Sequence, residues 1–265
     1  MKGFLTLLIL PIFLYALEVK NGEVKILNFD KNSTVFFDSK RVKTLKNPYK
    51  KGKFYLLLPI KYRERLGNHT LLIDGKKVSL RVEKGRYKKE SISVAKSKVK
   101  PDKKALNRIY KEYKSAKKIY ATFSDIAYWN KPFILPLHSK ITSHYGNARM
   151  FNHTLKSFHS GVDFRAKIGT KIEAANDGVV VIADDRYYAG GSVVIDHGQG
   201  LYSCYFHLSK ILVHKGQRVK QKELIGLSGQ SGRVNGPHLH FGIRLYSYAI
   251  NPLQFIKQIN TLMGH

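Results

Sequence analysis

The sequence predicts a mainly β protein in which two β-rich domains are joined by a linking helix. Short runs rich in β-branched and aromatic residues recur along most of the chain, and one segment, residues 102–123, has helical spacing instead. The chain has 265 residues, of which 43% are hydrophobic, so it can bury a substantial core.

Residues 1–16 have the pattern of a signal peptide. Lys2 precedes the apolar run 4–15, and Ala16 offers a small residue for cleavage. The run is too short to span a bilayer comfortably. Leu14, at position minus three, is not the usual small residue, so an uncleaved anchor is the alternative. We expect an exported protein, periplasmic or otherwise associated with the cell envelope.

Residues 17–85 are expected to form a small all-β domain, a sandwich. Asp74-Gly75 lies between two strand-like runs and is a strong hairpin signal. The domain offers no cluster of chemically useful side chains. Its expected strands lie within residues 23–29, 33–38, 53–60, 69–74 and 76–82.

Residues 86–130 are predicted to form a basic linker followed by an amphipathic helix. Pro101 ends the linker, and Asp102 is available as the helix N-cap. We expect the apolar, tyrosine-rich stripe of the helix to pack against a neighbouring domain. That stripe comprises positions 106, 109, 110, 113, 116, 120 and 123.

Residues 131–265 are predicted to form a second β-rich domain. Residues 170–185 suggest two strands with a turn at Asp177-Gly178, and residues 192–208 suggest two more around His197-Gly198. Asp196 and His197 could serve chemistry, but at a hairpin turn we expect them to stabilise the turn.

The single cysteine, Cys204, is expected to be buried and structural. One cysteine cannot form an internal disulfide in an exported protein. Strand alternation places Cys204 on an apolar face, where free cysteine commonly lies. The same face is predicted to carry Tyr202, Phe206 and Leu208.

The net charge is +29, and residues 1–130 carry +20 of it. Such a field attracts polyanions of any kind. For an exported protein these would be acidic envelope polymers or an anionic membrane surface, and we expect no specific nucleic acid. The alternative is a basic surface that contacts only solvent, and charge alone does not distinguish it from a polyanion-binding surface.

Histidines on two predicted strands face away from an apolar side. Alternation places His238 and His240 on one face, opposite the core residues of the same strand. The same argument places His207 beside Ser203 and Tyr205, away from the core. The core residues expected opposite His238 and His240 are Leu239, Phe241 and Ile243.

Together with His159 and Asp163, these histidines suit a zinc ion. Catalytic zinc sites use three His or carboxylate ligands and leave a fourth position for water. The ion lowers the pKa of that water to about 7. A nearby histidine can then take or give a proton.

Three ordered motifs carry a family resemblance. H-x-x-x-D at 159–163, "YFHLS" around His207 and "GPHLHF" at 236–241 resemble the lysostaphin/LytM-type zinc metallopeptidases. Members of that family cut peptide cross-links in bacterial peptidoglycan. The likeness runs from about Thr142 to Leu245, which implies an antiparallel β-sheet peptidase domain within residues 131–265.

The resemblance implies a role for each site residue. His159, Asp163 and His240 become the ligands of one Zn²⁺ per chain, and His207 and His238 become the catalytic histidines. The implied mechanism is attack of zinc-activated water on an amide carbonyl. The two histidines would handle the proton and stabilise the oxyanion.

Other residues near the motifs also correspond to positions of interest in the family. Arg149 lies where the family often has a basic residue, so it could contact substrate or the oxyanion, with surface solvation as the alternative. Some latent members fill the fourth zinc position with an upstream Asn. We do not expect this of Asn147 or Asn152. Lys222 replaces a common turn Gly, and a positive φ there would strain it.

For His159 and Asp163 to share an ion, the chain must bend between them. The β-rich context removes a helical pair, and four residues of straight strand span about 13 Å. We therefore expect a bend at Ser160-Gly161, permitted by Gly161.

The leading hypothesis is an exported zinc endopeptidase that acts on peptidoglycan stem peptides. A degenerate member that only binds and activates a wall amidase is a second reading, although such proteins typically lack ligands. A polyanion-binding protein is a third, and it would make the histidine pattern a coincidence.

Overall fold

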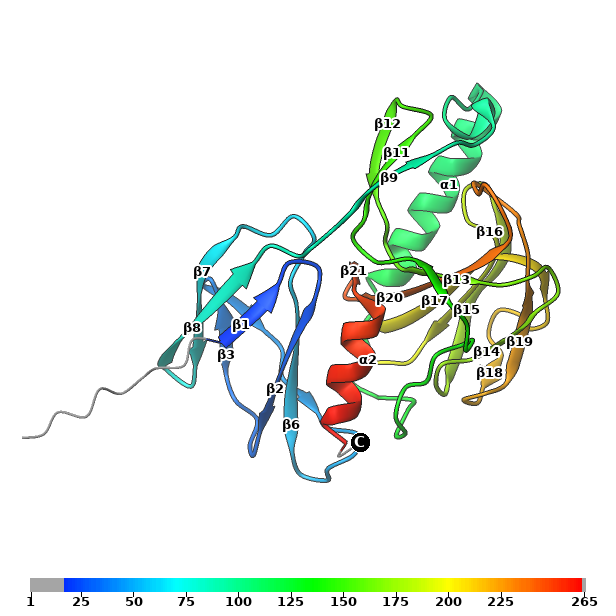
Figure 1. Ribbon diagram of the computed structural model, residues 1–265. Helices are drawn as coiled ribbons and strands as arrows, with labels where there is room; N and C mark the ends of the chain where they lie inside the picture. Colours follow the sequence, from blue (N-terminus) through cyan, green and yellow to red (C-terminus); the bar gives the residue numbers. More distant parts are fainter. Residues whose placement is uncertain (1–16, 264–265) are drawn as a thin grey trace, which may run out of the picture.

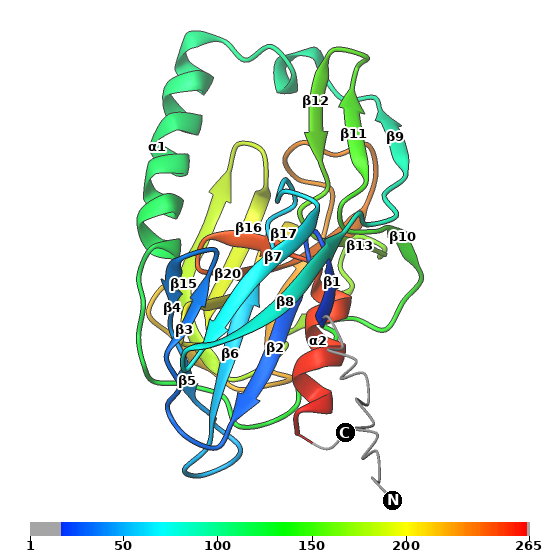
Figure 2. The same ribbon diagram turned by 90° about the vertical axis from the view of Figure 1, so that its left-hand side faces the viewer.

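The computed structural model describes residues 17–263. It confirms the mainly β class: two β-rich units lie side by side, with helix α2 between them and helix α1 along one flank (Figures 1 and 2). The predicted signal segment, residues 1–16, lies outside the described residues. Within residues 17–263, no helix is both long and apolar enough to cross a membrane.

The N-terminal unit is a sandwich of two sheets, as predicted. One sheet has the order β1-β8-β7-β3-β4 and the other β2-β6-β5. Asp74 and Gly75 form the predicted hairpin turn with φ values of 46° and 81°. The strands are β1 (Leu17–Lys20), β2 (Val24–Phe29), β3 (Val35–Phe37), β4 (Lys40–Val42), β5 (Leu45–Lys46), β6 (Phe54–Pro59), β7 (Gly67–Ile73) and β8 (Lys76–Glu83).

Strand β6 is buried on both faces. Leu56 and Leu58 pack between the two sheets of the sandwich, whereas Tyr55 and Leu57 belong to the core of the C-terminal unit. The side chain of Gln254, on α2 (Pro252–Thr261), also accepts from and donates to the backbone of Val24. The sheet β2-β6-β5 is therefore a layer shared by both units.

The segment predicted as a linker contains a strand, β9 (Lys89–Ile92). It pairs in parallel with β11 (Ala148–Phe151), which also pairs with β12 (Leu155–Phe158), and a 3₁₀ turn, η1 (Lys96–Lys98), follows. Figure 1 shows this chain running from the sandwich to the top of the C-terminal unit. Residues 89–92 are thus an integral part of the second unit.

Helix α1 (Lys103–Tyr120) begins as predicted, with the Asp102 side chain accepting from the Ala105 amide at 2.7 Å. Its packing face differs from the prediction. Ala116 and Tyr120 are buried, but Tyr110 and Tyr113 are more than 60% exposed. The reason is that the first half of the helix contacts the sheet through polar groups, Arg108 to Asp185 and Glu112 to the Tyr187 amide.

The main sheet of the C-terminal unit follows the path β10-β13-β20-β17-β16-β15-β18, and all its strand pairs are antiparallel. Strand β14 pairs with β19, and β21 pairs with β20. The strands are β10 (Ile141–Ser143), β13 (Val162–Arg165), β14 (Lys171–Glu173), β15 (Gly178–Arg186), β16 (Gly190–Asp196), β17 (Leu201–Ile211), β18 (Arg218–Val219), β19 (Leu224–Ser228), β20 (His238–Leu245) and β21 (Tyr248–Ile250).

The two predicted turns have different outcomes. Around His197-Gly198, β16 and β17 form the expected hairpin, and buried His197 is bonded to the Asp177 carbonyl and to Ser203 Oγ. The Asp177-Gly178 hairpin is wrong, because β14 and β15 do not pair. A side chain at Gly178 would instead meet the Asp196 carbonyl at 2.5 Å.

The prediction for Cys204 is confirmed, and the shape of the turn at Lys222 is now defined. Cys204 is buried under α1 in an apolar cluster with Tyr120 and Tyr202, where burial raises the pKa of its thiol. Lys222 has φ 69°, the left-handed conformation that a glycine would adopt at lower cost.

Candidate metal centre and its surroundings

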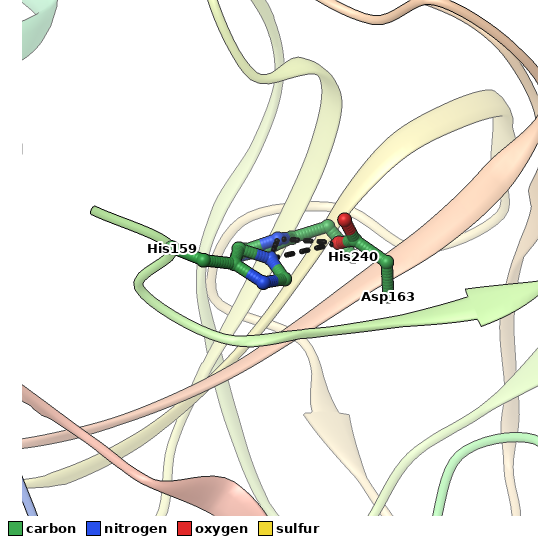
Figure 3. Close-up of side chains that lie close together, drawn as sticks. All are labelled: His159, Asp163 and His240. Carbon is green, nitrogen blue, oxygen red and sulfur yellow. Dashed lines mark hydrogen bonds and ion pairs between the residues drawn. The ribbon is translucent and has the colours of Figure 1, made fainter. Parts of the chain in front are cut away.

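Three side chains predicted as metal ligands meet beside the paired strands β13 and β20. Asp163 and His240 lie directly opposite one another in this antiparallel pair. His159 Nε2 lies 2.9 Å from both Asp163 Oδ1 and His240 Nδ1, and the last two atoms are 3.0 Å apart. Figure 3 shows the three side chains converging, and each residue is buried. The group could hold a metal ion.

The bend that joins His159 to Asp163 lies between β12 and β13, as predicted. The reason for glycine at position 161, however, differs from the prediction. Its φ is not in the left-handed region. A Cβ there would lie 2.4 Å from the Phe241 carbonyl oxygen and 2.7 Å from His240 Nε2. Gly161 is therefore needed for close approach to β20, and conformational freedom is not the reason.

Each candidate ligand is oriented by a second contact. His159 Nδ1 lies 2.9 Å from the His144 carbonyl, to which it donates, so Nε2 keeps its lone pair. Asp163 Oδ2 accepts from Arg149 Nη2 at 2.5 Å, which leaves Oδ1 for an ion. The His240 ring stacks on Phe206 with centroids 5.3 Å apart.

The protonation states suit metal ligation. Burial alone would raise the pKa of Asp163, but its contacts with His159 and His240 hold it well below its usual range. Burial lowers the pKa of His240 to about 4. The carboxylate is thus ionised and His240 is neutral at pH 7, the forms that bind metal.

His207 and His238 lie beside this trio: the rings of His207 and His240 are 6.0 Å apart, and His238 Nε2 is 3.7 Å from Asp163 Oδ1. His207 Nδ1 bonds to the Ser231 carbonyl and His238 Nδ1 to the Gly236 carbonyl, each at 2.8 Å. The two ring centroids are 4.8 Å apart. Burial and the neighbouring histidines hold the pKa of His207 well below 6.5.

The alternation argument is confirmed for β20 but wrong for β17. Leu239, Phe241 and Ile243 are core residues opposite His238 and His240. On β17, however, Tyr205 and Leu208 both face that core.

A β-bulge explains the discrepancy. Three steps on β17, from Tyr205 to Leu208, oppose two steps on β16, from Val193 to Gly191. The extra residue brings His207, at φ 67°, to the site.

Arg149 is held by two carboxylates. Its Nε lies 3.1 Å from Glu90 Oε2, and its Nη2 contacts Asp163. Only 15% of its side chain is exposed, so it is not the solvated surface residue of the alternative reading. Glu90, from β9, also accepts from Ser143 Oγ and Asn147 Nδ2. The sequence argument missed Glu90.

Both upstream asparagines bind the β9 segment. Asn147 Oδ1 accepts from the Lys88 amide, while its Nδ2 donates to Glu90. Asn152 exchanges two hydrogen bonds of 2.8 Å with the backbone of Val94. Their amides thus fix residues 88–94 against β11.

A cavity of about 200 Å³ opens onto His159 and His240 of the trio. Every residue that lines it comes from the C-terminal unit, so the sandwich and α1 contribute none of its walls. The lining residues are Arg149, Phe151, Ser157, Phe158, His159, Ser160, Tyr188, Ala189, Phe206, His207, Arg233 and His240.

Residues 157–252, which contain all five residues predicted as ligands or catalytic histidines, match the sequence model of peptidase family M23. This part of the chain belongs to peptidase family M23. This confirms the resemblance inferred from the three motifs. Arg149 and Glu90 precede the matched segment, so the M23 match does not bear on them.

Similar proteins agree with the M23 assignment. Peptidoglycan DD-endopeptidase ShyA of Vibrio cholerae is 43% identical over 45% of this chain, and the aligned part spans only 28% of ShyA. A Pseudomonas aeruginosa crystal structure assigned to peptidase M23 covers 89% of this chain and 94% of its own, with a TM-score of 0.68 and 25% identity. The catalytic domain of lysostaphin from Staphylococcus simulans is 34% identical over 45% of this chain and 92% of its own (TM-score 0.41).

Proposed function

We propose that the protein is a zinc metallopeptidase that hydrolyses peptide cross-links of bacterial peptidoglycan. The observation that carries the proposal is the convergence of His159, Asp163 and His240 beside a cavity, with the imidazoles of His207 and His238 next to them. The name of the relative ShyA, a peptidoglycan DD-endopeptidase, supports the substrate.

The donor set fits zinc. Two imidazole nitrogens and one carboxylate oxygen are a known catalytic zinc set, and a tetrahedral ion with bonds of ~2.0–2.1 Å holds its ligand atoms roughly 3.3 Å apart. The three donor atoms lie 2.9–3.0 Å apart, so a few tenths of an ångström of widening would admit the ion. Zinc held there would polarise a carbonyl and acidify water.

The unligated histidines would handle the proton. In each, Nδ1 is bonded to a backbone carbonyl, so Nε2 is the nitrogen left to exchange a proton. One can accept a proton from the attacking water, and the other, once protonated, can donate to the oxyanion or the leaving amine. We propose His207 and His238 for these two tasks.

For Arg149 we propose a positioning role in place of the substrate or oxyanion role expected from the sequence. Its Nε and Nη2 are committed to Glu90 and Asp163. By holding Oδ2 of Asp163, it would keep Oδ1 directed at the ion.

The proposed substrate supports a location in the cell envelope, consistent with the export expected from residues 1–16. The charge of +29 would favour contact with acidic envelope polymers or an anionic membrane surface. Both remain proposals, and binding to specific nucleic acid is not expected.

The test is metal content together with digestion of purified sacculi. The purified protein should carry about one zinc per chain and release soluble peptides, which mass spectrometry would identify along with the bond cut. His159→Ala should lose both properties, whereas His214→Ala, which changes an exposed histidine, should keep both. Intact sacculi after prolonged incubation with zinc-loaded protein would contradict the proposal.

A second pair of variants separates the roles within H-x-H. His240→Ala should lose zinc, while His238→Ala should keep zinc and lose activity, because only His240 belongs to the trio. Loss of zinc from His238→Ala would mean that the two roles are exchanged.

A further inference from the structure

One guanidinium at the cavity has no carboxylate to neutralise it. Arg233 lies in the loop between β19 and β20 and lines the cavity together with His159, His207 and His240. Within residues 17–263, no carboxylate lies within ion-pair distance of Arg233, and its side chain makes no hydrogen bond. The other cavity arginine, Arg149, is paired twice.

Two aromatic rings hold the Arg233 side chain in place. The guanidinium carbon lies 4.2 Å from the ring centroid of Phe151 and 4.3 Å from that of Tyr188. Cation–π contacts of this kind use the faces of the guanidinium plane. The N–H donors lie in that plane, at its edge, so stacking leaves them available for a planar partner.

The backbone beneath Arg233 is fixed to the catalytic histidine. The Arg233 amide donates to the Tyr188 carbonyl at 2.8 Å. Two residues earlier, the Ser231 carbonyl holds His207 Nδ1. A Cβ on Gly232 would approach the Gly190 amide nitrogen to 2.5 Å, so this loop and the 187–190 turn are in close contact. Arg233 therefore has a defined position relative to His207.

Burial lowers the pKa of Arg233, and Arg149 adds a smaller effect of the same sign. An arginine nevertheless keeps its charge at neutral pH. A half-buried, unpaired cation is costly without an anion, and a bidentate carboxylate is its best geometric match. A structural cation would be expected to have its counter-ion within the fold, as Arg149 does.

We infer that Arg233 binds a free carboxylate of the peptide substrate close to the bond that is cut. The inference rests on the proposed peptidase function and adds a specificity-determining residue to it. The carboxylate has two sources in a stem peptide: the C-terminus of the chain, or the side chain of the cross-linking diamino acid. Either would form two parallel N–H···O bonds with the in-plane donors.

The experiment compares kcat/KM for a cross-linked stem-peptide dimer in four forms. In the first form both carboxylates are free. In the second and third only one of the two is amidated, and in the fourth both are amidated. The wild-type holoenzyme should lose about 10- to 100-fold in kcat/KM when the recognised carboxylate is amidated, the value of a charge-assisted hydrogen bond. The modification that causes the loss identifies the source.

Arg233→Met should cleave all four forms with about the kcat/KM that the wild type has for the doubly amidated dimer. Arg233→Lys should restore part of the preference for the free carboxylate. Arg218→Met is the matched control, because Arg218 also stacks on an aromatic ring, Tyr128, but does not line the cavity. It should keep the wild-type preference. Zinc content and circular dichroism verify that each variant is folded.

Two results would overturn the inference. Arg233→Met could retain the wild-type ratio between free and amidated dimers, or it could lose the same factor on every form, as a purely structural residue would.

If the wild type cleaves neither the dimers nor sacculi, the proposed function fails, and calorimetric binding of the same four uncut peptides decides the inference about Arg233. A preference for the free carboxylate that Arg233→Met abolishes supports it. Equal wild-type affinity for free and amidated forms overturns it.

Discussion

At Gly161 the backbone passes so close to β20 that only a hydrogen fits. The nearest atoms to an added Cβ belong to the Phe241 carbonyl and the His240 ring. Close packing against β20, next to His240 of the candidate metal centre, therefore requires glycine at this position. The same position was expected to be glycine for its conformational freedom, which its φ does not require.

Gly161→Ala should displace His240 and weaken zinc binding. We expect overpacking to cost about 1–3 kcal/mol in the free energy of unfolding, measured by urea denaturation, together with a lower zinc stoichiometry. Gly242→Ala is the matched control, because its added methyl would meet nothing closer than 3.5 Å. A Gly161→Ala protein with full zinc and wild-type stability would contradict the steric argument.

His197 makes stability depend on pH. Burial lowers the pKa of His197 to about 4 from 6.5, so between these values the unfolded chain binds a proton that the folded chain does not. The effect of His197 on the free energy of unfolding is therefore absent above pH 6.5, and the free energy of unfolding falls as the pH drops toward 4. The free energy of unfolding of the wild type should fall about 1 kcal/mol more per pH unit than that of His197→Gln. Parallel pH profiles from urea titrations would refute this.

At the scale of the elements, the short strand β9 supports the site from behind. It brings Glu90 to Arg149, which in turn binds Asp163. A four-residue strand from outside the matched M23 segment thus sets the electrostatics behind one candidate ligand.

Glu90→Gln should weaken zinc binding without unfolding the protein. With a neutral side chain at position 90, the Arg149 guanidinium would attract the Asp163 carboxylate more strongly. Asp163 would then bind zinc less tightly. We expect a 10- to 100-fold rise in the zinc dissociation constant, measured by competition with a chelator. Lys89→Gln changes the exposed neighbour on the same strand and should leave the constant unchanged. An unchanged constant in Glu90→Gln would exclude the relay through Arg149.

What the sequence could predict depended on how local the signal was. Period-two alternation placed His238 and His240 correctly because β20 is regular. It misplaced the core side of β17 because the bulge at His207 is set by pairing with β16. Glu90 carried a faint signal, since it is the only acidic residue between Glu83 and Asp102, but its partner strand begins almost sixty residues later.

At the scale of the molecule, the two β-rich units share one core. Tyr55 and Leu57 of β6 pack with Trp129, Phe133 and other residues of the C-terminal unit. The sandwich therefore cannot separate from the second unit without exposing apolar surface on both.

Leu57→Ala should destabilise both units together. Its side chain is 1% exposed, and removing it from a packed core costs about 2–5 kcal/mol. We expect a single unfolding transition at lower urea, with Trp129 fluorescence and far-UV circular dichroism coincident. Hydrogen exchange should speed up in amides of both units. Two separate transitions would mean that the units fold independently.

The positions of the candidate ligands in the sequence also limit when, during synthesis and folding, the proposed ion could be bound. His159 and Asp163 emerge during synthesis well before His240, and β9, which supports Asp163 through Arg149, emerges earlier still. No complete trio exists until residue 240 has been made and β20 has docked beside β13. Capture of the proposed ion would thus be a late event, and for an exported chain it would draw on the zinc of the compartment in which folding finishes.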